Sequence, residues 1–241
     1  MLESARVIVV VPAFNEARWI AGTIAAMPSF VDEVLVVDDA SRDATAELAE
    51  AAGRASGLCV SVLRHQDNRG VGAAIATGYR AGRARGADVI AVMAGDGQMH
   101  PDDLAAVVRP IVRGEAAYVK GNRLRYPGAA RLMPTTRLVG TAALAFLTRH
   151  ASGLEQLGDS QCGYTAISAR AVDAIDLDAL WPRYGYPNDL LGALARARLP
   201  VEEVTVRPVY RGEASGLRPW HLATIGYVIG RVAYRRLAAS G

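Results

Sequence analysis

Cysteine is scarce in this sequence, which has only two in 241 residues, Cys59 and Cys162. The two lie far apart in apolar stretches, a spacing that fits no metal site. We therefore predict two small buried side chains, as in a protein of a reducing compartment. The four histidines likewise show no pairwise spacing typical of metal ligands.

Long hydrophobic runs are missing too. None reaches the roughly 18 residues that a membrane span needs, and the longest, 138–147 and 222–230, are each cut off by an arginine. The first residues lead into a strand-like run with neither the basic segment nor the cleavage site of a signal peptide. We expect a cytoplasmic protein, with peripheral attachment to the cytoplasmic face of the plasma membrane left open.

Acidic residues are rare near the C-terminus. From Arg207 to Arg236 there are six arginines and one acid, Glu213, although the whole chain has a net charge of only +3. The small net charge argues against nucleic acid as a partner. The local excess favours an anionic partner near the C-terminus, while a solvated basic tail is an equal alternative.

The residues that are present form short β-branched runs alternating with longer helical patterns. Uniformly apolar strands joined by helices indicate a Rossmann-like α/β fold, a mostly parallel sheet with helices on both faces. Ser41 and Asp43 are good cap residues for the second helix. Strands are predicted at 6–11, 33–37, 58–63 and 88–93, and helices at 16–27, 44–55, 71–85 and from Pro101 onward.

The alternation weakens after about residue 121. Residues 125–135 hold two arginines, two prolines and a glycine, which predicts a mobile loop. Two short strands are predicted beyond it, at 164–168 and 201–206. The pattern indicates one domain over 1–219, with a nucleotide-binding half at about 1–121 and a substrate half at about 122–219.

Polar side chains and glycines follow each of the first four predicted strands. In an open α/β sheet, ligands bind at the carboxyl ends of the strands, so these residues are candidates for a shared site. Each signal alone is weak, because Asn15 and Ser41 are also common helix caps and glycines also form turns. The residues at the four strand ends are Pro12 to Glu16, Asp38 with Asp39, Asn68 to Gly72, and Asp96.

Four of these segments, in this order and spacing, resemble the family 2 glycosyltransferases with the GT-A fold: VVVPAFNE, VVDDASRDAT, NRGVGAAIATG and MAGDGQMHP. The similarity is closest to the branch of dolichyl-phosphate mannose synthase and other polyprenyl-phosphate sugar transferases. It extends to about residue 220 through KGNRL, DSQCGYTAIS, YGYPNDLL and RGEASGLRPW. The resemblance implies an inverting, metal-dependent transfer of a hexose from a UDP- or GDP-sugar to a polyprenyl or dolichyl phosphate.

The resemblance also implies roles for residues that bind the nucleotide-sugar. Asp39 would accept hydrogen bonds from the base, and Asp38 would support its loop. Glycines at 70 and 72 would let the backbone approach the nucleotide. Arg123 would close over phosphate from a flexible loop. The full set is Pro12, Phe14, Asn15, Glu16, Asp38, Asp39, Gly70, Val71, Gly72, Asp96 and Arg123.

The sequence departs from the family pattern at Asp96. Most members have two acids here, whereas this chain has Ala94-Gly95-Asp96. Mg²⁺ or Mn²⁺ on a diphosphate needs only one or two protein oxygens, because phosphate oxygens and waters complete the shell. We therefore predict that Asp96 holds the metal with the carbonyl of Gln98. The alternative, a cap for the helix near His100, is less favoured.

Candidate residues for the transfer itself lie in the second half. The resemblance implies that Asp159 and Gln161 lie near the reacting sugar. It implies that Asp189 is a general base where the acceptor is a hydroxyl, although Asp189 also fits a helix cap. Arginines in glycine-bearing loops suit phosphate binding, and the predicted phosphate and acceptor residues are Arg211, Ser215 and Arg218.

The C-terminal segment, 220–241, is predicted to form an amphipathic helix. Ile225, Val228, Ile229 and Val232 share one face. That stripe fits a helix on an anionic membrane, and it equally fits packing on its own domain or on a homodimer partner.

Two alternative functions stay open at this point. One is the same donor chemistry on a soluble sugar or alcohol, and the other is a nucleotide-sugar binder without catalysis. A hydroxyl acceptor needs a positioned general base, whereas a phosphate monoester is already ionised at pH 7. The uncertain base candidates and the basic C-terminal third therefore favour the lipid phosphate.

Overall fold

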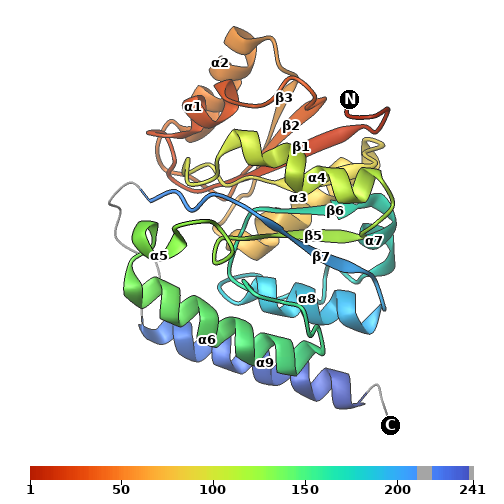
Figure 1. Ribbon diagram of the computed structural model, residues 1–241. Helices are drawn as coiled ribbons and strands as arrows, with labels where there is room; N and C mark the ends of the chain where they lie inside the picture. The colour runs from red at the N-terminus through yellow and green to blue at the C-terminus, as the bar shows by residue number, and fades with distance from the viewer. Residues whose placement is uncertain (211–218, 239–241) are drawn as a thin grey trace.

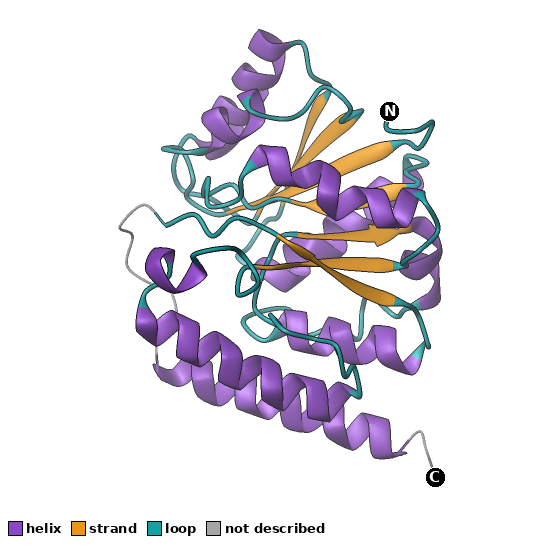
Figure 2. Cartoon of the chain, in the orientation of Figure 1, coloured by secondary structure: helices purple, strands orange, loops and turns teal. Residues whose placement is uncertain are grey.

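The computed structural model of the protein describes residues 1–210 and 219–238, with side chains except at 219 and 220. A seven-stranded sheet in the order β3-β2-β1-β4-β6-β5-β7 lies between helices on both sides (Figure 2). The strands are β1 (Val7–Ala13), β2 (Glu33–Asp38), β3 (Val60–Arg64), β4 (Val89–Val92), β5 (Tyr118–Asn122), β6 (Thr165–Ser168) and β7 (Val201–Thr205). The helices are α1 (Ile20–Ala25), α2 (Thr45–Ser56), α3 (Val71–Ala84), the 3₁₀ turn η1 (Pro101–Asp103), α4 (Leu104–Val112), α5 (Ala129–Leu132), α6 (Thr135–Ser152), α7 (Ala169–Ala174), α8 (Tyr186–Arg196) and α9 (Pro219–Ala238).

The central strands are apolar at nearly every position because both faces of the sheet are covered. In β1, Val7, Val9 and Val11 belong to one core with α1, α2 and α4, whereas Ile8 and Val10 belong to the other core with α3, α7 and α8. This alternation is the period of two that a strand imposes on its side chains. The predicted α/β class, with helices on both faces, is confirmed.

One strand runs against the others. β6 pairs antiparallel with both β4 and β5, while β1, β2, β3 and β4 pair in parallel and β7 runs parallel to β5. The beginning of β6 therefore lies at the edge where the other strands end. Residues 158–163, which precede β6, consequently reach the same edge as the loops that follow β1 to β5.

Some local predictions were wrong. α1 begins at Ile20 rather than at residue 16, because the backbone N–H groups of 15–17 are hydrogen-bonded to the loop before α2. Residues 125–135 include the short helix α5 and the start of α6, and their Ala129 and Met133 are buried. A four-residue helix is too short to show a period in the sequence. Cys162 is buried as expected, but Cys59 is exposed because it precedes the edge strand β3.

The C-terminal helix α9 packs on the protein itself. It contacts α8 and α6, and the stripe of Ile225, Val228, Ile229 and Val232 is buried in these contacts (Figure 1). Of the three interpretations of that stripe, the structure supports packing on the chain's own domain. Among the described residues, no helix has the length and apolar character needed to cross a bilayer.

Candidate functional site

The loops after β1 and β2 are fastened to each other. The backbone N–H of Asn15 donates to the Ser41 hydroxyl (2.9 Å), and the N–H of Arg42 donates to the Asn15 side-chain oxygen (2.9 Å). Asn15 has a left-handed φ of 57°, which asparagine tolerates better than most residues. Neither side chain caps a helix, so both of these polar residues serve to shape the edge of the sheet.

A cleft of about 480 Å³ opens at the ends of β1, β2 and β3. Its volume lies within the usual range for small-ligand sites. Phe14, predicted to border a base, is 44% exposed, and an aromatic ring presented to solvent suits stacking on a nucleobase. The cleft is lined by Phe14, Asp38, Ala40, Ser41, Arg42, Arg64, His65, Gln66, Asp67 and Asn68.

The two adjacent acids after β2 have different surroundings. Both oxygens of the buried Asp39 are occupied: Oδ1 accepts from His65 Nδ1 (2.7 Å) and the Arg69 N–H (2.9 Å), and Oδ2 accepts from the Gly70 N–H (2.7 Å). Asp38 lies in the cleft wall and accepts from Arg64 Nε (3.3 Å). Asp38 is equally buried, and its Oδ1 accepts the Ser41 backbone N–H (3.0 Å), so both carboxylates hold loops in place beside the cleft.

The glycines before and within α3 allow a close contact inside the chain. A Cβ at Gly70 would lie 2.7 Å from the Pro182 carbonyl oxygen, and one at Gly72 would lie 2.5 Å from the Trp181 carbonyl oxygen. Gly70 also has a φ of 96°, which side chains rarely adopt. Val71, the first residue of α3, is 39% exposed beside them. These glycines therefore let segment 181–183 pack against the start of α3, next to the cleft.

Asp96 lies in a tight turn just beyond β4. Its Oδ1 accepts the backbone N–H of Gln98 (2.9 Å), and Gly97 between them has a left-handed φ of 69°. Both Asp96 and Gln98 are partly exposed. They offer a carboxylate and a carboxamide oxygen, which are hard donors that suit Mg²⁺ or Mn²⁺. No cluster of three or more His, Cys, Asp or Glu side chains that could hold a metal occurs among the described residues. The donor set therefore fits an ion that also binds phosphate oxygens.

This turn connects the two halves of the site. On one side a Cβ at Gly95 would lie 3.5 Å from the Glu16 side chain, and the Gly95 N–H lies 3.4 Å from the Pro12 carbonyl oxygen. On the other side, the Tyr164 hydroxyl donates to the His100 carbonyl (3.0 Å). The cleft, the Asp96 turn and the segment before β6 thus follow one another along a single edge.

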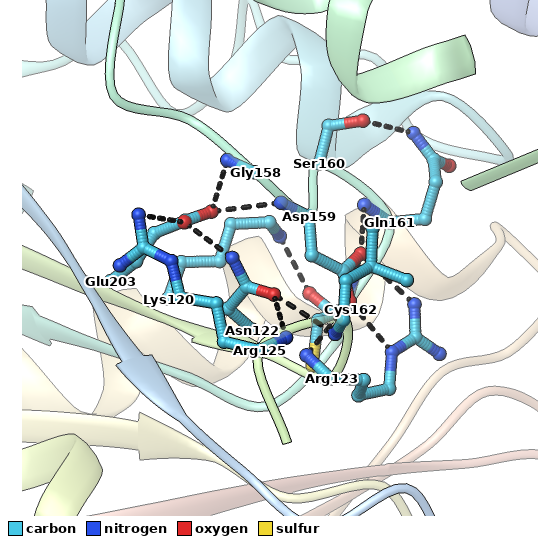
Figure 3. A network of polar contacts seen from close by, with 11 residues as sticks. Lys120, Asn122, Arg123, Arg125, Gly158, Asp159, Ser160, Gln161, Cys162 and Glu203 are labelled. Atoms are coloured by element: carbon cyan, nitrogen blue, oxygen red, sulfur yellow. Dashed lines mark hydrogen bonds and ion pairs between the residues drawn. The ribbon is translucent and has the colours of Figure 1, made fainter. Parts of the chain in front are cut away.

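Arg123 and Asp159 form a buried ion pair at the other end of that edge (Figure 3). Nε and Nη2 of Arg123 donate to the two oxygens of Asp159 (2.8 and 3.0 Å), and the Arg123 backbone N–H also donates to Oδ2 (3.2 Å). The N–H groups of Gln161 and Cys162 donate to Oδ1. Burial alone would raise the pKa of Asp159, but the charge and hydrogen bonds of Arg123 outweigh it and lower that pKa.

Three residues that the sequence analysis missed surround this pair. Glu203 of β7 accepts the N–H groups of Gly158 and Asp159 (2.8 and 2.9 Å) and the Asn122 side-chain amide (2.6 Å). Lys120 of β5 is fully buried, donates to the Cys162 carbonyl (2.6 Å), and has its pKa lowered by burial. A charged side chain within a strand-like run, as in YVKGN or VEEVT, is the signal that marks them in the sequence.

The remaining predicted residues of the second half lie deeper. The Gln161 side chain donates to Asn188 Oδ1 (3.1 Å), which joins segment 158–163 to α8. Asp189 is fully buried, accepts the Trp181 N–H (2.8 Å), and faces Arg231 and Arg235 of α9 at 3.7 and 3.9 Å. The structure thus places Asp189 between α8 and α9 rather than in the open part of the edge. The predicted phosphate-binding residues Arg211, Ser215 and Arg218 lie outside the described residues.

Curated relatives match most of the chain. It is 35% identical to the undecaprenyl-phosphate mannosyltransferase of Micrococcus luteus, over 86% of this chain and 84% of that protein. It is 29% identical to the UDP-N-acetylglucosamine–dolichyl-phosphate N-acetylglucosaminyltransferase of Methanococcus voltae, over 83% and 84% of the two chains. It is 30% identical to the polyprenol monophosphomannose synthase of Mycolicibacterium smegmatis, over 83% and 76%.

Solved structures share the fold. Mannosyl-3-phosphoglycerate synthase of Rubrobacter xylanophilus superposes with a TM-score of 0.71 at 19% identity, over 98% of this chain and 75% of that one. Glucosyl-3-phosphoglycerate synthase of Mycobacterium tuberculosis, in complex with Mn²⁺, UDP and glucosyl-3-phosphoglycerate, gives 0.66 at 22%, over 98% and 80%. The model of the glycosyl transferase family 2 matches residues 8–175. The sheet order, the strand-end site and these matches lead to one conclusion: the chain belongs to the family 2 glycosyltransferases and has their GT-A fold.

Proposed function

We propose that this glycosyltransferase moves a hexose from a UDP- or GDP-sugar to a polyprenyl or dolichyl phosphate, with inversion at the anomeric carbon. The relatives from Micrococcus luteus, Methanococcus voltae and Mycolicibacterium smegmatis are named as enzymes that transfer mannose or N-acetylglucosamine to a dolichyl, undecaprenyl or other polyprenol phosphate. The nucleoside would lie in the cleft against Phe14, and the sugar would point along the edge toward Arg123 and Asp159.

Asp96 and Gln98 would hold Mg²⁺ or Mn²⁺ on the donor diphosphate. Structures of the glucosyl-3-phosphoglycerate synthase of Mycobacterium tuberculosis contain UDP with either Mn²⁺ or Mg²⁺. When bound, such an ion would stabilise negative charge on the departing nucleoside diphosphate. A single carboxylate suffices for this, because the phosphate oxygens are themselves ligands.

One observation distinguishes a hydroxyl acceptor from a phosphate acceptor: the two carboxylates that could act as a general base are already engaged in other contacts. Both oxygens of Asp159 already accept hydrogen bonds from Arg123 and backbone N–H groups, and a lowered pKa makes this carboxylate a poor proton acceptor. Asp189 is fully buried against α9. A hydroxyl acceptor would need one of them as a general base, whereas an ionised phosphate needs none. The geometry therefore favours a phosphate acceptor.

In the proposed reaction, a phosphate oxygen of the acceptor attacks the anomeric carbon on the face opposite the nucleoside diphosphate. The bond from that carbon to the diphosphate oxygen breaks as the new bond forms, through an oxocarbenium-like state. Asp159 orients the Arg123 guanidinium through Nε and Nη2, so that this fixed positive charge faces the developing anion. Arg211, Ser215 and Arg218 are the proposed binding residues for the acceptor phosphate.

The test compares acceptors in one assay. The protein is incubated with UDP- and GDP-hexoses, Mn²⁺, and either a polyprenyl phosphate in detergent or soluble sugars and phosphoglycerate. We expect transfer to the polyprenyl phosphate, retained in Asp189→Asn. Efficient transfer to a soluble hydroxyl, lost in Asp189→Asn, would overturn the proposal.

A further inference from the structure

Helix α6 has its polarity reversed. The side that faces the protein carries small and hydroxylated residues, with Thr141, Thr148 and Ser152 buried. The outer side carries Val139, Phe146 and Leu147, which are 62%, 52% and 50% exposed. An ordinary surface helix presents its apolar stripe to the core and its charges to water.

A hydrogen-bond chain explains why the buried side of α6 carries polar residues. Asn188 of α8 donates to the Thr148 hydroxyl (2.7 Å), which in turn donates to the Leu144 carbonyl (2.7 Å). The interior at this point therefore needs a hydroxyl. Among the described residues, none covers the large apolar side chains on the outer face, and exposed apolar surface of this kind marks an interaction site.

Helix α9 lies beside α6 and adds to the same outer layer (Figure 1). Its Ile225 and Val228 are buried, yet its outward residues are apolar or aromatic as well. Exposed large side chains on α9 are Leu222, Tyr227, Tyr234 and Leu237. We call the exposed residues of α6 and α9 together the α6/α9 face.

The two segments that carry this face contain basic residues but no acids. Residues 123–154, which include α5 and α6, contain five arginines and no aspartate or glutamate, and 219–238 contain no acid either. Arg123 is paired with Asp159, but Arg149 lies over the Phe146 ring, and Arg236 donates to the His150 carbonyl. Apolar side chains beside arginines, without acids, are the composition of surfaces that bind anionic lipid.

We propose that the α6/α9 face is the surface by which the protein docks on an anionic lipid bilayer. Leu222, Phe146, Leu147 and the tyrosines enter the headgroup region, and the arginines contact lipid phosphates. A second copy of the chain is a poorer fit, because a two-fold interface would bring this positive face against itself.

This inference rests on the proposed function, because docking on a membrane is useful to an enzyme whose acceptor is a membrane lipid. α6 follows α5, which the loop after Arg123 joins to β5, and α9 follows the segment that contains Arg211, Ser215 and Arg218. Docking through the α6/α9 face would place the acceptor end of the site next to lipid headgroups. A lipid-borne phosphate would then reach the enzyme without leaving the membrane.

The experiment is vesicle co-sedimentation of the full chain, with phosphatidylglycerol-containing vesicles compared with pure phosphatidylcholine. The variant Phe146→Glu/Leu147→Glu places acids on the face. Leu48→Glu is the matched control, because Leu48 is also exposed (37%) but lies on α2, far from α6 and α9 (Figure 1). Thermal unfolding of each variant checks the fold, which we expect to survive because all three side chains are exposed.

We expect salt-sensitive binding to the anionic vesicles, weakened about tenfold or more in the double variant and unchanged in Leu48→Glu. Unchanged vesicle binding in the double variant would overturn the proposal. So would a stable dimer without lipid that the double variant dissociates into monomers. Transfer to polyprenyl phosphate in detergent should persist in the double variant, so failed docking and failed catalysis are distinguishable.

Discussion

The two ends of the active edge are built in different ways. At the β3 end, the cleft is open, its walls are loops held by hydrogen bonds between side chains and backbone, and residues such as Arg64 are half exposed. At the β5 end, Asp159 and Lys120 are fully buried, and the Arg123 side chain is only 22% exposed. The difference shows that the proposed donor end is an open space that a ligand can fill, whereas the proposed acceptor end is a fixed arrangement of charged side chains.

Removing an arginine should therefore lower the free energy of unfolding much more at the β5 end than at the β3 end. We expect Arg123→Ala to lower the free energy of unfolding by about 3–5 kcal/mol, because Asp159 would keep a buried charge without its partner. Arg64→Ala, at an arginine that is itself 54% exposed and contacts the buried Asp38 and the exposed Glu47, should lower it by much less. Urea titration measures both. Similar losses in the two variants would contradict the contrast between the ends.

Asp96 lies between the two ends, and its replacement should affect chemistry more than folding. We expect Asp96→Asn to lower the transfer rate about 100-fold or more, because a divalent ion supplies several kcal/mol of charge stabilisation. Calorimetry with UDP and GDP should also show that Mn²⁺ no longer tightens nucleotide binding. Asp102→Asn, at an exposed acid of η1, is the control. Equal Mn²⁺ dependence in Asp96→Asn and the wild-type protein would rule out the metal role.

His65 is a useful test of the comparison between the two ends, because its side chain is buried although it lies at the open, β3 end. It joins Asp39 Oδ1 (2.7 Å) to the Thr77 hydroxyl of α3 (3.0 Å), and Asp39 holds the Gly70 loop. We expect His65→Ala to cost about 1–2 kcal/mol of stability and to weaken nucleotide binding, with His100→Ala, at a partly exposed histidine, as the comparison. Titration of UDP and GDP checks this prediction. Nucleotide affinity equal to that of the wild-type protein would show that His65 only fills space.

The smallest effect is one of pH. The pKa of Asp159 is lower in the folded chain, so its contribution to stability is complete above the unfolded value of about 3.9. That contribution is lost only as the pH falls through the lower folded pKa. Asp159→Asn should therefore flatten the acid limb of the stability curve, measured by denaturant unfolding at a series of pH values. A wild-type curve that lost this stability near pH 6 would contradict the assignment.

The sequence predicted the sheet better than the ends of its helices. Buried strands such as β1 and β2 are short runs rich in valine, a residue that favours strands. The late start of α1 was not predictable, because it depends on hydrogen bonds from the backbone of 15–17 to Ser41, Asp43 and Thr45, which are distant in sequence.

The site shows the same division. The positions of Asp96 and Phe14 at strand ends could be predicted, because strand ends and motifs are local in sequence. Glu203 was missed, because its importance comes from meeting Asn122 and Gly158 across the fold. The roles of Asp38 and Asp39 also depend on which of them His65 contacts, and only the structure shows that contact.

Because β6 runs in the reverse direction, the segment before it can change in evolution separately from the loops of the cleft. The segment from Gly153 to Gly163 enters the active edge from the side opposite to the nucleotide loops, and β6 pairs with β4 through only four residues. The exposed residues near its start, Glu155 and Gln156, can be exchanged while Asp159 and the parallel strands that form the cleft keep their positions. New acceptor specificity would then arise by drift in this one segment, with the donor chemistry inherited intact.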